Sequence, residues 1–316
     1  MIFAWGKNFI AKNKKTIDIM NIIFKIVVCM VVVGLLLNNK ILGNIGTIER
    51  LGFGWGIDCK LNSLKIVFIP IVATLIWIFK DKITFRAPKL ILVIKCILLI
   101  TSPIILFTVV EMCWNEKRTE MQTTYIVLNI FMYAILEIAA LLLLTRDSLG
   151  LRFLYVLSFA LGTANSYVYQ FRGKPILPTD ILDAGTAMRV AENYQYNLTD
   201  GMAWGLLITY IMWCILSVKP QYKHITLKRS QKIGFRFLTL IILIVSVTVG
   251  FYRIDLTEKF HVVEEYWSMW GAYENAGFLP AFVACLQDIS PQKPDGYSTE
   301  KAEVILEEAK SDDILK

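Results

Sequence analysis

Two aspartates in the middle of this 316-residue chain have the type and spacing to do chemistry. Asp180 and Asp183 are three positions apart, so on a helix their carboxylates would share a face and could act as an acid pair or bind a metal ion. No histidine or third acid lies close by in the sequence, and two carboxylates alone make a weak metal site. A structural role is simpler: Asp180 fits an N-cap and Asp183 the first helical turn, where the helix dipole favours negative charge.

The cations around these aspartates suggest contact with lipid. Arg172, Lys174 and Arg189 are candidates to bind lipid phosphates at a membrane surface. Glycine and proline break the helix before Asp180. A short amphipathic helix is expected to follow on the outer membrane surface, because Leu177, Ile181, Ala184, Met188 and Ala191 have helical spacing.

A second charged pair, Lys95 and Glu137, lies inside long apolar stretches. At about 1.5 Å per residue, the two side chains lie at similar depths from the cytoplasmic ends of neighbouring helices, so we expect them to pair. A charge inside the membrane is a functional hypothesis by default. No further acids or histidines form a proton relay with them, which favours an ion pair that serves packing.

The six cysteines and two histidines give no metal-binding pattern. Cys59 and Cys113 fall in predicted outer loops and could form a disulfide. His224 and His261 are expected on opposite sides of the membrane, so they cannot share a site. There is also no glycine-rich phosphate loop or nucleophile elbow. We therefore expect no complete catalytic site, no metal and no cofactor in this chain.

The candidate residues named above lie within or between long apolar stretches, so the helices that these stretches form must set their positions. The chain is 56% hydrophobic with a mean hydropathy of +0.55, above the roughly 45–50% that is usual for a soluble domain. Each apolar stretch has about the length that a helix needs to cross the bilayer. The sequence predicts an all-α, polytopic transmembrane helix bundle with about seven spans, over residues 20–37, 64–79, 90–110, 125–144, 153–170, 202–217 and 235–252.

The basic residues orient this bundle. Connections on the side of the N-terminus carry twice as many Lys and Arg as those on the opposite side, so that side should be cytoplasmic. Seven crossings then place the C-terminus outside the cytoplasm. The net charge of +7 follows this pattern and indicates a membrane rather than nucleic acid as the partner.

The last part of the chain differs in character from the rest. Residues 1–252 are predicted to form the bundle, and residues 253–316 an extracytoplasmic, helical juxtamembrane linker. Within the linker, residues 277–286 are apolar but too short to cross, and fit a surface helix or a helix docked on the core. Ser298 is a candidate cap for a final helix with a narrow apolar face.

Two stretches of the chain resemble a known family. They are Tyr169-Gln-Phe-Arg-Gly-Lys-Pro-Ile-Leu-Pro-Thr-Asp-Ile-Leu182, continuing to Tyr196, and Glu274-Asn-Ala-Gly-Phe-Leu-Pro-Ala-Phe282 with Lys293-Pro-Asp-Gly-Tyr-Ser298. In these stretches the chain resembles the membrane portion of lipoteichoic acid synthase-like proteins, which are phosphoglycerol transferases of the sulfatase type. The resemblance covers residues 150–310 well.

The resemblance implies a role in cell-wall polymer synthesis at a bacterial plasma membrane. In the family, a threonine nucleophile and the manganese ligands lie in an extracellular domain, and no position of this chain corresponds to them. Manganese is thus expected only in that absent domain. The implied partners are the bilayer, a phosphatidylglycerol-like lipid, and an extracellular catalytic domain that follows this chain or belongs to another. The chain itself would be the membrane anchor and platform.

Two other functions fit the same sequence. A lipid or small-molecule transporter would need broken helices and a polar site at mid-membrane, for which Pro70 and Pro103 are candidate kinks. A self-contained lipid-modifying transferase would use Asp180 and Asp183 as its acids.

Overall fold

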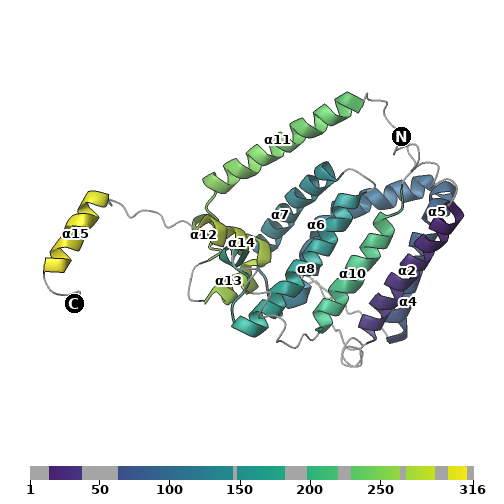
Figure 1. The fold of residues 1–316 in the computed structure, drawn as a ribbon, viewed down its shortest axis with the longest axis horizontal. Coiled ribbons are helices and arrows are strands. Elements are labelled where there is room, and N and C mark those ends of the chain that lie inside the picture. Colours follow the sequence, from purple (N-terminus) through teal and green to yellow (C-terminus); the bar gives the residue numbers. More distant parts are fainter. Residues whose placement is uncertain are drawn as a thin grey trace.

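The prediction of an all-α bundle is confirmed. The computed structural model describes residues 14–37, 63–144, 148–181, 198–219, 229–263, 268–288 and 298–311, and every regular element in these ranges is a helix. The longer helices are α2 (Lys14–Leu36), α4 (Ser63–Ile78), α6 (Pro88–Trp114), α7 (Thr123–Leu143), α8 (Leu149–Arg172), α10 (Asp200–Leu216) and α11 (Arg229–Arg253) (Figure 1). The shorter ones are α5 (Lys80–Arg86), η1 (Pro178–Ile181), α12 (Leu256–Phe260), α13 (Met269–Ala276), α14 (Phe278–Gln287) and α15 (Thr299–Ser311).

Four helices in the described residues are long and apolar enough to cross a membrane: Thr16–Leu36, Pro88–Trp114, Thr123–Leu143 and Arg236–Arg253. They coincide with the first, third, fourth and seventh predicted spans. The second and sixth correspond to the shorter apolar helices α4 and α10, and the fifth to α8, which carries more polar residues. By its helices this is a membrane protein, and the count of seven crossings stays a prediction.

Apolar side chains cover the outside of the bundle. Ile100 on α6 and Phe131 on α7 are 78% and 63% exposed, which would be costly in water and is normal for a surface that faces lipid. The apolar part of α11, Arg236–Arg253, contains no buried residue. Figure 1 shows α11 at the edge of the bundle, where it contacts α7, and Gln287 of α14 donates to the Phe251 carbonyl near its end. The apolar outer surface is the arrangement expected for a bundle in a bilayer.

Helix α6 is the centre of the fold, since it packs against α7, α8 and α10. Small residues allow its close approach to α10. A Cβ atom added at Gly201 would lie 1.8 Å from the carbonyl oxygen of Met112, so only glycine fits at this crossing. Without a hydrophobic driving force between helices in lipid, such close backbone packing is a main source of helix association.

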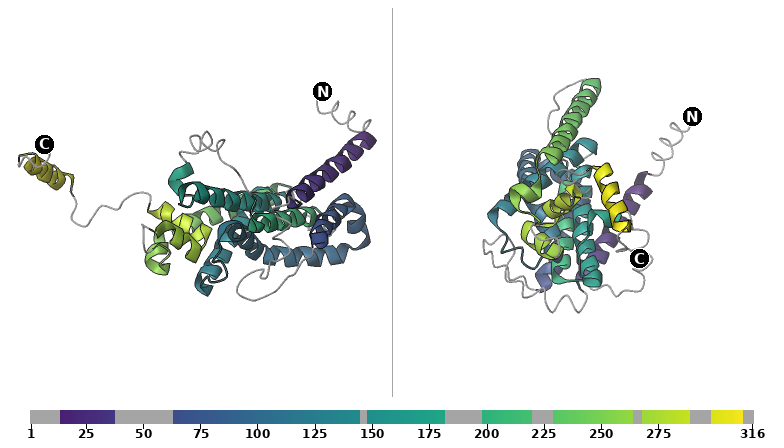
Figure 2. Two further views of the ribbon diagram at one scale, coloured as in Figure 1. Left: turned by 90° about the horizontal axis from the view of Figure 1, so that it is seen from below. Right: turned by 90° about the vertical axis from the view of Figure 1, so that its left-hand side faces the viewer.

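The packed part of the chain continues beyond the predicted boundary at residue 252. Helices α12, α13 and α14 contribute Leu256, Tyr273 and Phe278 to the same buried cluster as α6, α7 and α8. Both Figure 1 and the left view of Figure 2 show α12–α14 gathered at one end of the bundle, with α15 set apart from it. Of the two alternatives predicted for residues 277–286, the structure has the docked helix. The described residues 253–263 and 268–287 therefore pack with the bundle, whereas the prediction assigned them to the linker.

The charged pair predicted inside the membrane has a different arrangement. Lys95 Nζ donates to Ser148 Oγ at 3.0 Å, whereas Glu137 forms a hydrogen bond with Ser102, whose hydroxyl lies 3.0 Å from that of Tyr155. Ser102 is seven residues beyond Lys95 on α6, about 10 Å along the axis. The predicted pairing assumed that the cytoplasmic ends of the two apolar stretches lie at the same depth. In the structure Glu137 lies beside Ser102 and not beside Lys95.

The disulfide between Cys59 and Cys113 is not formed. Cys113 lies inside α6, which continues to Trp114, rather than in an outer loop. Its thiol is free and buried, and it donates to the carbonyl oxygen of Val109 at 3.1 Å. Cys59 itself lies outside the described residues.

Candidate functional site

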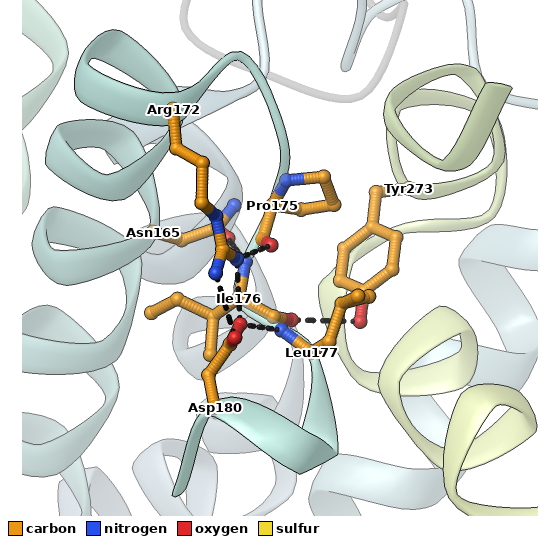
Figure 3. A network of polar contacts seen from close by, with 7 residues as sticks. All are labelled: Asn165, Arg172, Pro175, Ile176, Leu177, Asp180 and Tyr273. Atoms are coloured by element: carbon orange, nitrogen blue, oxygen red, sulfur yellow. Dashed lines mark hydrogen bonds and ion pairs between the residues drawn. The ribbon is translucent and has the colours of Figure 1, made fainter. Parts of the chain in front are cut away.

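Arg172 and Asp180, two of the residues singled out in the sequence, meet in a tight turn after α8, at the end of the bundle where α13 and α14 pack. Helix α8 ends at Arg172, and Gly173 follows in the left-handed conformation (φ +68°), which glycine adopts readily. The Arg172 guanidinium forms a fork with Asp180: Nη1 and Nη2 each lie 2.6 Å from a carboxylate oxygen. Nη2 also donates to the Pro175 carbonyl at 2.7 Å (Figure 3).

The backbone of this turn is held from both sides. The Ile176 amide donates to Asn165 Oδ1 on α8 at 2.8 Å, and the Ile176 carbonyl accepts from the Tyr273 hydroxyl on α13 at 2.9 Å. Figure 3 shows these contacts converging on one short piece of chain between α8 and α13. The turn thus fixes the C-terminal segment against α8.

Asp180 lies in η1, and its carboxylate accepts from the Leu177 amide, three residues earlier, at 2.7 Å as well as from Arg172. The residues that would form the predicted helix after it lie outside the described part of the chain, so its role as a cap stays a prediction. The hydrogen bonds from Arg172, and then the one from Leu177, hold the pKa of this carboxyl below its ordinary value of 3.8. The contact with the Arg172 guanidinium was not predicted, because the sequence shows the proline and aspartate spacing but not which side chain reaches the carboxylate.

The other predicted residues of this segment have separate outcomes. The Arg172 guanidinium is bound by Asp180 and Pro175, so it is less available to a lipid phosphate than predicted. Lys174 is exposed, and its contact with lipid stays a prediction. Asp183, Arg189 and most of the expected amphipathic helix lie outside the described residues.

A second polar cluster, which sequence reasoning missed, holds the junction between α13 and α14. The amide of Phe278, at the beginning of α14, donates to Glu111 Oε1 at 2.8 Å. Asn129 Nδ2 donates to the carbonyl of Ala276, the last residue of α13, at 2.7 Å. These backbone groups are among those that a helix terminus leaves without an intrahelical partner. Side chains of α6 and α7 therefore cap both helices of the docked segment.

The same cluster includes Asn115, directly after α6. Its side-chain nitrogen donates to Glu111 Oε2 at 2.8 Å and to the Glu274 carbonyl at 3.0 Å. Glu111, Asn115 and Asn129 are almost completely buried, where a polar group without a partner costs about 1–3 kcal/mol. Glu111 and Asn129 stand inside or at the edge of apolar stretches, and that position was the available signal in the sequence.

Gly277 joins the two helices in a conformation that other residues rarely adopt. Its φ of +87° and ψ of 162° lie in a region occupied almost only by glycine. A Cβ atom at this position would be 2.6 Å from Asn129 Nδ2. The junction thus depends on glycine for both its backbone and its contact with α7.

An ion pair at the surface completes the junction. Lys117 Nζ lies 2.8 Å from Glu274 Oε2, and this hydrogen bond raises the pKa of Lys117 above its ordinary value. Lys117 is largely exposed, so its pair contributes little to stability. No group of three or more potential metal ligands occurs among the described residues. Glu111, Asn115 and Asn129 bind backbone groups of the docked segment, which is a positioning role.

In comparisons with known proteins, no family model, curated protein or solved structure matches the chain.

Proposed function

We propose that this chain is the membrane platform of a phosphoglycerol transferase of the sulfatase type, and that it is not catalytic alone. The catalytic domain would be held at the outer surface of a bacterial plasma membrane, next to a phosphatidylglycerol-like donor lipid. The single observation that carries the proposal is the docked α13–α14 segment, whose backbone is capped by α6 and α7.

This observation links the two stretches that carry the family resemblance. Residues 169–182 and 274–282 are far apart in the sequence, yet the Tyr273 hydroxyl next to the second stretch donates to the Ile176 carbonyl in the first. Helix α14 also contacts η1. A stretch that only connects two domains would not need such contacts, whereas one that sets the position of a following domain would.

The physical task of a platform is to fix height and orientation above the bilayer. Because α14 is buried in the bundle, the chain leaves it at a defined place after Gln287. Helix α15 then begins with its predicted cap, since Ser298 Oγ accepts from the Lys301 amide at 3.2 Å. Val304, Ile305 and Leu306 of α15 are all more than half exposed, so their apolar side chains are available to a following domain.

The alternative of a self-contained transferase has less support. Of its two proposed acids, Asp180 is already engaged by Arg172 and the Leu177 amide, and Asp183 lies outside the described residues. A general acid or base needs a free oxygen within hydrogen-bond reach of its substrate.

The first test concerns sidedness. Glu300 on α15 and Lys89 on α6 are both exposed, and the proposal places them on opposite sides of the membrane. In right-side-out vesicles, a membrane-impermeant maleimide should label Glu300→Cys and leave Lys89→Cys unlabelled until the vesicles are opened. The parent protein gives the background from native cysteines. The reverse pattern would rule out an external platform.

The second test concerns function. A sulfatase-type phosphoglycerol transferase domain joined after Lys316 should transfer glycerol phosphate from labelled phosphatidylglycerol to polymer. Replacing Glu111 by Leu and Asn129 by Leu should undock α13–α14 and lower transfer, at equal amounts of protein in the membrane. The matched control is Phe131→Leu, which alters the exposed face of α7. Equal transfer by all variants, or by the same domain on an unrelated single-span anchor, would argue against a platform.

A further inference from the structure

Helix α5 joins the ends of the apolar helices α4 and α6, and Figure 1 shows it at the end of the bundle away from α13 and α14. Its backbone continues the helical hydrogen bonding of its neighbours. The Ile83 amide donates to the Phe79 carbonyl at 3.0 Å, and the Ala87 amide donates to the Ile83 carbonyl at 3.1 Å. Thr84 is buried, so one face of α5 is fixed against the bundle. The opposite face is therefore held in place at the level where lipid headgroups begin.

The outer face of α5 and the first turn of α6 carry three exposed cations, which we call the basic cluster: Lys82, Arg86 and Lys89. In the described part of the chain no ion pair joins any of them to an acid. Residues 80–89 contain four cations and one acid, Asp81, which leaves a net charge of +3. This charge is complementary to an anionic lipid surface, where each cation contributes to binding.

An apolar surface adjoins the basic cluster. It begins one residue after Lys89 with three residues of α6 that are all more than half exposed, which we call the apolar stripe: Leu90, Val93 and Ile97. Their spacing of three and then four residues puts them on one face of α6. Phe85, on α5 itself, is 79% exposed. The combination of fixed cations and an adjoining apolar face matches a phospholipid, which has a charged headgroup above its acyl chains.

The apolar groups favour a lipid over a soluble anion. The apolar stripe belongs to Pro88–Trp114, a helix that is long enough to cross a membrane, so a soluble polyanion could reach the cations but not the stripe. Lys82 Nζ lies 5.5 Å from the centre of the Phe79 ring, which is itself 45% exposed. A cation that rests on an exposed aromatic ring is typical of side chains that extend from apolar surface to headgroups.

We propose that the α5 corner binds an anionic phospholipid from the leaflet on its own side of the membrane. The lipid phosphate lies among the side chains of the basic cluster, and an acyl chain lies along the apolar stripe. The basic residues of the connections predict this side to be cytoplasmic, so the bound lipid is not the donor lipid of the proposed transferase, which lies in the other leaflet. The inference does not depend on the proposed function.

Binding can be measured by native mass spectrometry of the full chain in a non-ionic detergent, from the titration of the first lipid adduct. Phosphatidylserine is the anionic probe, because it is not the proposed donor lipid, and phosphatidylcholine with the same acyl chains is the zwitterionic comparison. Inorganic phosphate is added as a competitor at constant ionic strength. We expect phosphatidylserine to bind more tightly than phosphatidylcholine, the preference to decrease as ionic strength rises, and phosphate not to compete.

Variants of exposed residues separate the site from the fold. The combination of Lys82→Gln, Arg86→Gln and Lys89→Gln should weaken phosphatidylserine binding by about fivefold for each cation removed and leave phosphatidylcholine binding unchanged. The matched control removes the same number of exposed cations elsewhere, at Arg253, Lys259 and Lys301.

The control variant should bind phosphatidylserine like the parent. The proposal is overturned if phosphatidylcholine binds the parent as tightly as phosphatidylserine, or if the basic-cluster variant binds like the parent. It is also overturned if the control variant loses as much affinity as the basic-cluster variant, or if inorganic phosphate displaces the lipid, which would indicate a site for a free anion.

Discussion

Replacing Gly277 by alanine tests whether the junction between α13 and α14 is as constrained as its geometry indicates. An alanine must adopt a backbone conformation that costs about 1–3 kcal/mol. Its Cβ would also lie 2.6 Å from Asn129 Nδ2, so Asn129 must move and release the Ala276 carbonyl. Losing that buried hydrogen bond costs about 1–3 kcal/mol more. We expect the free energy of unfolding to fall by about 2–6 kcal/mol.

The protein is unfolded with SDS in mixed micelles, and unfolding is monitored by the reaction of the Cys113 thiol, which is buried in the folded state, with a thiol dye. Gly271→Ala is the control in the same segment, because Gly271 is inside α13 and an added Cβ would meet only the mobile end of Ser268. It should leave stability unchanged or raise it by up to about 1 kcal/mol.

The two contributions at Gly277 can be separated. In an Asn129→Ala background, the steric conflict and the lost hydrogen bond are already removed, so Gly277→Ala should cost only the backbone part, about 1–3 kcal/mol. An equal cost in both backgrounds would show that Asn129 plays no part. A Gly277→Ala variant within about 0.5 kcal/mol of the parent would refute the reasoning as a whole.

Two further predictions concern the turn after α8 and the centre of the bundle. Because Arg172 lowers the folded-state pKa of Asp180, the pair stabilises the protein above the ordinary pKa of 3.8, and this contribution is lost as the pH falls through the lower folded-state value. Asp180→Asn should therefore lower stability at neutral pH and flatten its decline below pH 3.8, as measured by unfolding at a series of pH values; an unchanged profile would contradict the assignment. Gly201→Ala would bring a Cβ within 1.8 Å of the Met112 carbonyl oxygen, so it should destabilise the bundle by at least about 1–3 kcal/mol. Gly34→Ala, which meets nothing within 4 Å, should be neutral in the same assay, and equal effects of the two would disprove close packing at Gly201.

The helices could be predicted from the sequence because membrane spans leave a strong and local signal. The long apolar stretches agree with α2, α6, α7 and α11 to within a few residues. Helix α8 was also found, although Asn165 and Ser166 make it more polar. These two side chains are tolerated because they are buried in the bundle, where α8 packs against α6, α7 and α10.

The contacts could not be predicted, since each joins groups that are distant in the sequence. Glu111 and Asn129 bind backbone groups about 150 residues later, and a backbone amide or carbonyl has no signature in the sequence. Lys95 and Glu137 were paired by depth alone, and a shift of two helical turns was enough to separate them. Asp180 binds the Arg172 guanidinium eight residues earlier, a contact that its position in the sequence does not reveal.

The capping of α13 and α14 by side chains of earlier helices sets an order for biogenesis. A ribosome completes Glu111 and Asn129 long before it reaches Phe278, so the nascent protein first holds them with only their local partners, Asn115 and the Tyr125 carbonyl. Their bonds to the α13–α14 junction form only when that last segment docks. Insertion is therefore complete only when α13 and α14 have docked. A nascent chain in which they do not dock would keep incompletely bonded polar side chains within its apolar helices, which is costly in lipid and would mark the chain for quality-control proteases.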